Sequence, residues 1–228
     1  IKRGIRNRKR SIMKKNIILF DLDGTLLNTE EGISKCVRHA LEKFGIQEEN
    51  QKKIRRFIGP PLFDSFQREY GFSEEDSWKA VAYYRERYDD IGVWECKLYP
   101  QVEETLQKLS EQGYRIGVAS SKPEKFCPLL MKHFGIDKYF EVIGGATSDG
   151  KAGSKAAVLE DVLKRFGVTD KNEVVLIGDT RYDALGAKEV GIDCIGITYG
   201  FEQDMDSMRE AGAHICDTLE EVMAYLEE

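Results

Sequence analysis

Two aspartates separated by a single residue stand directly after a short apolar run near the start of the chain. Asp21 and Asp23 belong to the sequence Asp-Leu-Asp-Gly-Thr, which follows Ile-Ile-Leu-Phe at 17–20. Carboxylates can act as nucleophiles, as general acids and bases, and as ligands of hard cations. Gly24 lets the backbone turn sharply and approach a ligand closely. A plain Asp-Gly turn at a polar strand end is the alternative, but four fixed positions in D-x-D-G-T favour a reactive site.

Further polar residues follow later apolar runs in the same way. Ser120 and Ser121 end one run, and Asp179 ends another, with Asp183 four residues further on. Taken singly, Asp179 is interpreted as a helix N-cap and Asp183 as an acid in a first helical turn. Taken with Asp21, they predict several carboxylates close together at one edge of the fold. Such carboxylates repel one another unless a cation lies between them. Hard oxygen ligands of this kind suit Mg²⁺, so we expect a magnesium site.

The segments that must position these residues alternate between strands and helices. The expected strands are 17–20, 115–119, 140–143, 173–177, 193–197 and 214–215. The expected helices are 102–112, 154–166, 182–190, 204–211 and 219–226. Pro123 is expected in the first turn of the helix that follows the second strand. This alternation predicts an α/β fold with a parallel sheet, whose ligands bind at the carboxyl ends of the strands.

The stretch from Glu30 to about Leu98 differs, because it shows only helical periodicity. Helices are expected to end at Gly45, before Gly59, at Gly71 and near residue 90. Ser73 is a candidate N-cap for the last of them. About 70 residues without a strand signal, inserted after the first strand, predict a separate helical domain.

Composition and charge exclude several classes of function. The chain is 41% hydrophobic and carries a net charge of −6. Residues 1–15 hold eight lysines or arginines and no acid, so the body is more acidic still, which argues against a nucleic-acid surface. No apolar run reaches the ~18 residues of a membrane span, and no signal-peptide core is present, so we expect a cytoplasmic protein without membrane contact.

The basic leader is interpreted as foreign to the folded protein. Met13 stands just before the first strand, so residues 1–12 are expected to be an expression-vector remnant or an upstream leader.

The cysteines and histidines show no metal-ligand or redox spacing. The number of cysteines is odd and no C-x-x-C occurs, so buried reduced thiols are expected. These residues are Cys36, Cys96, Cys127, Cys194, Cys216, His39, His133 and His214.

Four segments, taken in order, resemble the motifs of the haloacid-dehalogenase-like (HAD) hydrolase superfamily, in its phosphoglycolate-phosphatase-like branch. They are DLDGT at 21–25, VASS at 118–121, Lys155 at a helix start, and GDTRYD at 178–183. The resemblance runs from about Met13 to the end of the chain. It implies a Rossmann-like HAD core over 13–29 and 99–228, with a mobile all-helical cap over 30–98.

The resemblance also implies a Mg²⁺-dependent phosphatase that acts on a small phosphorylated metabolite. Asp21 would attack phosphorus and form an aspartyl-phosphate, and Asp23 would protonate the leaving oxygen and later activate water. The magnesium ligands would be the Asp21 side chain, the Asp23 backbone carbonyl and Asp179, with Asp183 acting through water. The phosphoryl oxygens would be held by Gly24, Thr25, Ser120, Ser121 and Lys155.

The substrate stays open at this point. Phosphoglycolate, pyrophosphate, nucleoside monophosphates and sugar phosphates all fit, and a pyrophosphatase, a phosphomutase or a non-catalytic regulator on the same scaffold are alternatives. The loop 57–62 is a candidate specificity loop, with Arg55 or Arg56 available to an anionic substrate. Both arginines are equally well interpreted as solvated helix charges.

The phosphate-binding lysine has two candidates. Many relatives carry Lys-Pro at the third motif, whereas this chain has Lys151 in a glycine-rich stretch and Lys155 after Ser154. We favour Lys155, because a lysine in a first helical turn opposes the helix dipole and needs an anion to offset it. The protein is expected to be a monomer or a homodimer.

Overall fold

The computed structural model describes residues 15–147, 154–202 and 204–227. The basic leader, Met13 and Lys151 therefore lie outside the described residues. Within them, six strands form a parallel sheet in the order β5-β4-β1-β6-β7-β8. The strands are β1 (Ile17–Phe20), β4 (Arg115–Pro123), β5 (Val142–Ala146), β6 (Val174–Gly178), β7 (Asp193–Ile197) and β8 (His214–Cys216).

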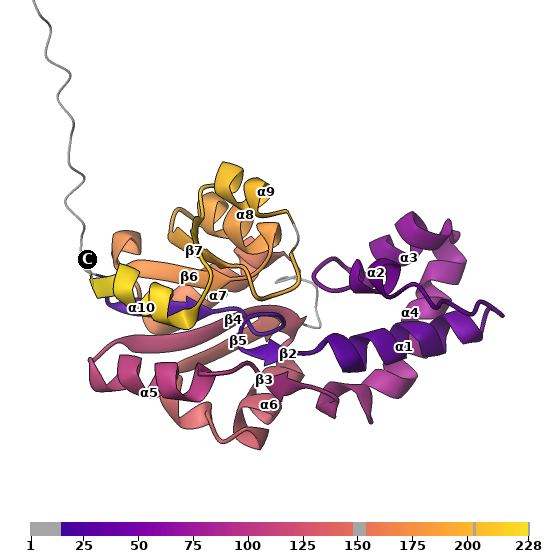
Figure 1. Ribbon diagram of the computed structural model, residues 1–228, viewed down its shortest axis with the longest axis horizontal. Helices are drawn as coiled ribbons and strands as arrows, with labels where there is room; N and C mark the ends of the chain where they lie inside the picture. The colour runs from indigo at the N-terminus through magenta and orange to yellow at the C-terminus, as the bar shows by residue number, and fades with distance from the viewer. Residues whose placement is uncertain (1–14, 148–153, 203, 228) are drawn as a thin grey trace, which may run out of the picture.

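β1 lies at the centre of the sheet and pairs with β4 on one side and β6 on the other. Its side chains alternate between two apolar clusters: Ile18 and Phe20 pack into one, and Ile17 and Leu19 into the other. Helices cover both faces, as Figure 1 shows. One face carries α5 (Val102–Glu111), α6 (Cys127–His133) and α10 (Leu219–Glu227); the other carries α7 (Lys155–Phe166), α8 (Arg181–Val190) and α9 (Met205–Ala211). The predicted α/β fold is confirmed.

The helices after β1 gather to one side of the sheet (Figure 1). They are α1 (Glu30–Glu42), α2 (Gln51–Arg55), α3 (Leu62–Tyr70) and α4 (Glu74–Tyr88). Ser73 caps α4 as predicted, because its side chain accepts a hydrogen bond from the Asp76 N–H at 3.1 Å. A two-stranded antiparallel ribbon, β2 (Leu27–Asn28) and β3 (Lys97–Leu98), stands where this helical part leaves and rejoins the core. We did not predict the ribbon, because two residues are too few to show a period.

Two predicted boundaries are wrong near β4 and β5. β4 continues beyond Ala119 to Pro123, so Pro123 ends a strand, and Pro128 takes the place in the first turn of α6. The pairing register shifts between Ala119 and Pro123, which no sequence period reveals. β5 begins at Val142, two residues later than expected, and a short 3₁₀ turn ends at Tyr139 before it. The 3₁₀ turns are η1 (Gly92–Trp94), η2 (Glu124–Phe126), η3 (Asp137–Tyr139) and η4 (Lys171–Glu173).

None of the helices in the described part of the chain is long and apolar enough to cross a bilayer. The cysteines are free, and four of the five are buried.

Candidate active site at the carboxyl end of the sheet

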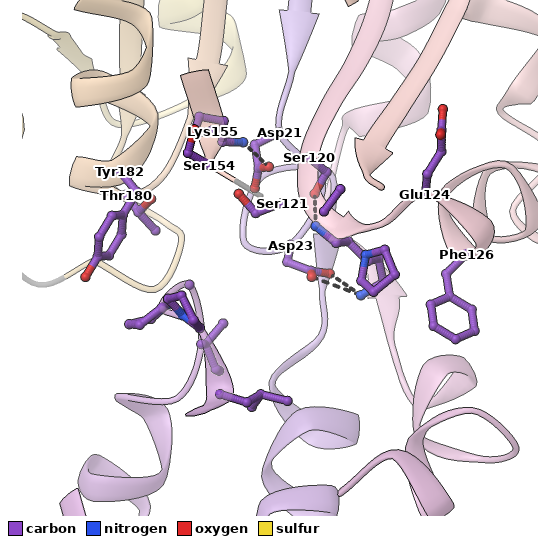
Figure 2. Close-up of a pocket in the computed structure, with 18 of the residues that line it drawn as sticks. Asp21, Asp23, Ser120, Ser121, Glu124, Phe126, Ser154, Lys155, Thr180 and Tyr182 are labelled. Atoms are coloured by element: carbon purple, nitrogen blue, oxygen red, sulfur yellow. Dashed lines mark hydrogen bonds and ion pairs between the residues drawn. The ribbon is translucent and has the colours of Figure 1, made fainter. Parts of the chain in front are cut away.

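A cleft lies where the central strands end, between the sheet and the helices α1–α4, and Figure 2 shows part of it. Six of the predicted residues line it: Asp21, Asp23, Ser120, Ser121, Lys155 and Asp183. β1 leads into Asp21 and Asp23, and β4 carries Ser120 and Ser121. Lys155 begins α7 and approaches Asp21 from the neighbouring helix (Figure 2). The topology therefore brings together side chains more than a hundred positions apart in sequence.

Asp21, Asp179 and Asp183 form a buried cluster in which one carboxylate oxygen of each residue lies within 4.8 Å of the other two. Burial raises the pKa of Asp21 to about 6; the charge of Lys155 opposes this rise and that of Asp183 adds to it. Burial, together with the charges of Asp183 and Asp21, raises the pKa of Asp179 well above its ordinary value. The three acids therefore repel one another in a water-poor site.

Lys155 supplies a positive charge to this cluster. Its Nζ lies 2.5 Å from Asp21 Oδ1, 2.7 Å from Asp183 Oδ1 and 2.8 Å from the carbonyl oxygen of Ala119. Burial by itself lowers the pKa of Lys155, but the charges of Asp183 and Asp21 outweigh it and raise that pKa above its usual range. One ammonium against three carboxylates leaves the site with an excess of negative charge when all are ionised.

The cluster fits a small hard cation. Asp183 Oδ1 has no hydrogen-bond partner of acceptable geometry in the described part of the chain, although Lys155 is close. Gly24 and Gly200 enclose Asp179 tightly: a Cβ at either position would lie 2.1 or 2.3 Å from its side chain. Gly24 also has a φ of +87°, which favours glycine. Three buried carboxylates that share one ammonium are a donor set that suits Mg²⁺.

Gly24 and Thr25, which we predicted to bind phosphate, lie against Asp179. Thr25 Oγ1 donates a hydrogen bond to Asp179 Oδ1 at 3.4 Å, and the Phe201 N–H donates to Asp179 Oδ2 at 2.7 Å. Neither Gly24 nor Thr25 lines the cleft. Their contacts therefore fix the buried carboxylate, and phosphate binding by these two residues stays a prediction.

Asp183 faces the cluster with one oxygen and caps its own helix with the other. Its Oδ2 accepts hydrogen bonds from Thr180 N at 3.0 Å and Thr180 Oγ1 at 2.7 Å. Thr180 is therefore the N-cap of α8, and the alternative reading of Asp179 as the cap is wrong. The first-turn position expected for Asp183 is confirmed, and it does not exclude a role at the site.

Asp23 is held apart from the cluster by a lysine that we did not predict. Each of its carboxylate oxygens lies 2.9 Å from Lys122 Nζ, and Figure 2 marks both contacts as dashed lines. Burial by itself lowers the pKa of Lys122, but the charge of Asp23 outweighs it and raises that pKa above its usual range. Lys122 directly follows Ser120 and Ser121 in the sequence, beyond the strand that we expected at 115–119.

The two serines lie in the last part of β4, near Asp21 and Asp23 in the view of Figure 2. Ser120 is buried and its Oγ accepts a hydrogen bond from the Lys122 N–H at 3.3 Å, whereas Ser121 is exposed. Both line the cleft. Their hydroxyl and amide groups are therefore available at the place where the acids converge.

The loop 57–62, between α2 and α3, lines the cleft, as its candidate role requires. Phe57 anchors it, because this ring is buried and lies edge-on to Phe66 at 4.9 Å between centroids. Gly59 faces the core: a Cβ there would lie 3.6 Å from Thr180 Cγ2. The loop thus spans the opening between the helices α1–α4 and the sheet.

Arg55 and Arg56 do not line the cleft. Arg55 Nε lies 3.0 Å from Glu30 Oε1, and Arg56 Nη1 lies 3.2 Å from Glu69 Oε2. These ion pairs within the helical part favour the interpretation of both arginines as helix charges.

Comparison with known proteins agrees with this geometry. Residues 18–197 match the family model of the haloacid dehalogenase-like hydrolases. The chain belongs to this family. It is 37% identical over 210 residues to a 5'-nucleotidase of Pseudomonas aeruginosa, with 92% of this chain and 95% of the relative covered. It is 30% identical to phosphoglycolate phosphatase 1 of the same organism, covering 91% and 78% of the two chains.

A solved structure gives the same result for the fold of this HAD protein. The crystal structure of a predicted phosphatase from Clostridium acetobutylicum superposes with a TM-score of 0.88 at 37% identity, covering 95% of this chain and all of that one. The family and fold expected from the four motifs are confirmed. The chain is a HAD-type phosphatase.

Proposed function

We propose that this protein hydrolyses a small phosphomonoester in two steps, through a phosphorylated Asp21. The observation that supports it is the division of labour among the acids. Asp179 is fully buried and does not line the cleft, and Asp183 lines it but also caps α8 through Thr180, whereas Asp21 lines the cleft and caps no helix. Asp23 stands nearby with its carboxylate outside the cluster. One acid is thus placed to attack and another to move protons.

In the first step an Asp21 oxygen forms a bond to phosphorus as the bond from phosphorus to the ester oxygen breaks. Asp23 gives its proton to that oxygen, and the alcohol leaves. In the second step water attacks phosphorus and gives a proton to Asp23, while the bond from phosphorus to Asp21 breaks. Inorganic phosphate leaves, and both acids return to their starting forms.

The residues around Asp21 would hold the phosphoryl oxygens during both steps. Lys155 and Ser120 are buried and carry donors, and Ser121, the next residue of β4, lines the same cleft and would add its amide. The backbone N–H groups of Gly24 and Thr25 already donate to the carbonyl oxygens of Leu27 and Leu22 at 2.8 and 3.3 Å, so their part would be to shape the turn after β1. Donors fixed in a water-poor site stabilise charge that develops in transit.

Magnesium would be held by Asp21, Asp179 and the Asp23 backbone carbonyl, with Asp183 in support, and when bound it supplies positive charge that offsets the repulsion among these acids. The fit rests on the three buried carboxylates and on Asp183 Oδ1, which has an ion pair with Lys155 but no hydrogen bond of acceptable geometry in the described part of the chain.

Treatment with EDTA is therefore expected to abolish hydrolysis of p-nitrophenyl phosphate, and added Mg²⁺ to restore it. The physical reason is that one ammonium cannot balance three carboxylates and an incoming phosphate dianion. Release of p-nitrophenolate is the measurement, and circular dichroism before and after chelation shows that the fold persists. Full activity in rigorously metal-free buffer would contradict the metal site.

We propose residues 30–98 as a cap whose closure excludes water, and its cleft-facing loop as the part that selects the substrate. The two named relatives are a 5'-nucleotidase and a phosphoglycolate phosphatase, so proteins of this family are named for substrates with different leaving groups. A phosphoglycolate-like acid, a nucleotide or a sugar phosphate is the class that we propose here.

Leu62→Ala is expected to change preference among substrates more than it changes turnover of p-nitrophenyl phosphate. Leu62 lines the cleft at the end of the loop and is half-buried, so its loss reshapes the wall against the leaving group. The ratio of kcat/KM values between phosphoglycolate, a nucleoside monophosphate and a sugar phosphate should shift by about 10-fold. Leu129→Ala is the control, because Leu129 is exposed on α6 and lies outside the cleft lining. An equal loss on every substrate would make the loop structural.

A further inference from the structure

The ion pair between Lys122 and Asp23 is not an ordinary surface pair, because the lysine is buried. Its side chain is 2% exposed, whereas that of its partner Asp23 is 21% exposed. Of the two groups, the carboxylate is therefore the one that faces the solvent. The ammonium contacts both Asp23 oxygens at 2.9 Å. Two such contacts restrict rotation of the carboxylate, because turning it in either direction lengthens one of them.

The course of β4 places Lys122 in the interior. The strand continues past Ala119 with a shift of register, and Ser121 and Pro123 are exposed on either side of the buried Lys122. A buried ammonium is costly unless it is paired, and a methionine would fill similar space without that cost. The presence of a lysine here therefore calls for a reason beyond packing.

The other neighbour of Lys122 comes from the cap. The ammonium lies 5.2 Å from the ring centroid of Tyr88, near the end of α4. Tyr88 is itself buried, stacked on Tyr84 at 5.2 Å and edge-on to Phe126 at 5.6 Å. One side chain of the core thus contacts an acid of the D-x-D pair and an aromatic ring of the cap at the same time.

We propose that Lys122 is a positioning residue that aims the Asp23 carboxylate at the reacting oxygen, and that Tyr88 makes this aim depend on α4 lying against the core. The inference rests on the proposed function, because it needs Asp23 to move protons. Between the two steps Asp23 has given up its proton and must take another from water. That intermediate form is the carboxylate that Lys122 holds with two contacts.

The test is Lys122→Met with p-nitrophenyl phosphate in a stopped-flow measurement with saturating Mg²⁺. p-Nitrophenolate leaves without being protonated, so phosphorylation of Asp21 stays fast, while hydrolysis of the phosphoenzyme slows because Asp23 is misaimed. The expected result is a burst of about one p-nitrophenolate per active site, then a steady rate reduced roughly 10²-fold. Glycerol 3-phosphate, whose leaving oxygen needs a proton, should show a slow first step and no burst.

Matched variants separate positioning from packing. Lys125→Met removes a nearby lysine that is 62% exposed and paired with Asp89 of the cap, and it should behave as wild type. Tyr88→Leu removes both the ring that lies near the ammonium and the hydroxyl that interacts with Lys122, and it should produce the burst in weaker form. Asp23→Asn should produce the same burst, and adding Lys122→Met to it should cost nothing further, because both changes remove one function.

Several outcomes would overturn the inference. A higher KM with unchanged kcat would mean that Lys122 contacts substrate, and slow turnover without a burst, or additive losses in the double variant, would mean a structural role. If Lys122→Met does not fold, the same stopped-flow burst is measured on Lys122→Arg and Tyr88→Leu, and its presence or absence there decides whether Lys122 positions Asp23. Wild-type protein inactive on every phosphomonoester with Mg²⁺ would defeat the proposed function, whereas active wild type with an unaffected Lys122→Met would defeat only this inference.

Discussion

Asp21→Asn is expected to abolish turnover, with a loss on the order of 10⁴-fold or more, because an amide cannot form the acyl-phosphate on which both steps depend. The variant should stay folded. Burial already raises the pKa of Asp21 to about 6, so a neutral side chain removes repulsion within the cluster of acids. Loss of activity can then be assigned to chemistry and not to unfolding.

The measurement that identifies the nucleophile is the mass of acid-quenched enzyme after mixing with p-nitrophenyl phosphate. No phosphorylated species should form in Asp21→Asn, whereas Asp23→Asn should accumulate one, since it is impaired mainly in proton transfer, by roughly 10²-fold or more. Asp64→Asn is the control, because Asp64 is an exposed acid that lines the same cleft from α3. Near-wild-type turnover by Asp21→Asn would show that another group attacks phosphorus.

The core of the fold and its acids were accessible from sequence because both follow from local rules. The run 17–20 predicts a strand buried on both faces, and β1 is that strand. Parallel strands end at one edge, so acids that follow separate strands must approach one another. That rule placed Asp21 and Asp179 together, and the position of Asp183 in a first helical turn added the third carboxylate.

The features that escaped prediction depend on contacts between distant segments. Lys122 is buried because β4 runs on through it and because Tyr88 comes down from the cap. Arg55 was a candidate for binding an anionic substrate, because the residues next to it in sequence do not show that it pairs with Glu30. Burial of a lysine and pairing of an arginine in this way depend on tertiary packing. They produce no periodic pattern in the sequence from which they could be predicted.

Lys155→Met is expected to lower both activity and stability, since Lys155 is bonded to two of the three clustered acids. Without its Nζ, Asp21 and Asp183 lose contacts of 2.5 and 2.7 Å and remain buried. Removing one partner of such a pair costs about 3–5 kcal/mol of folding free energy. The same change should lower kcat/KM roughly 10²-fold or more, the scale of one lost partner for transition-state charge.

The two losses can be told apart with magnesium. A cation bound among the acids should restore much of the thermal stability of Lys155→Met, because it offsets their repulsion, yet it should leave kcat/KM low, because the phosphoryl group still lacks the ammonium. Thermal melts with and without Mg²⁺, beside steady-state kinetics, measure both. Lys164→Met is the control from the exposed side of α7. Lys151→Ala should cost far less than Lys155→Met, and the reverse ranking would show that Lys151 is the lysine that holds the phosphate.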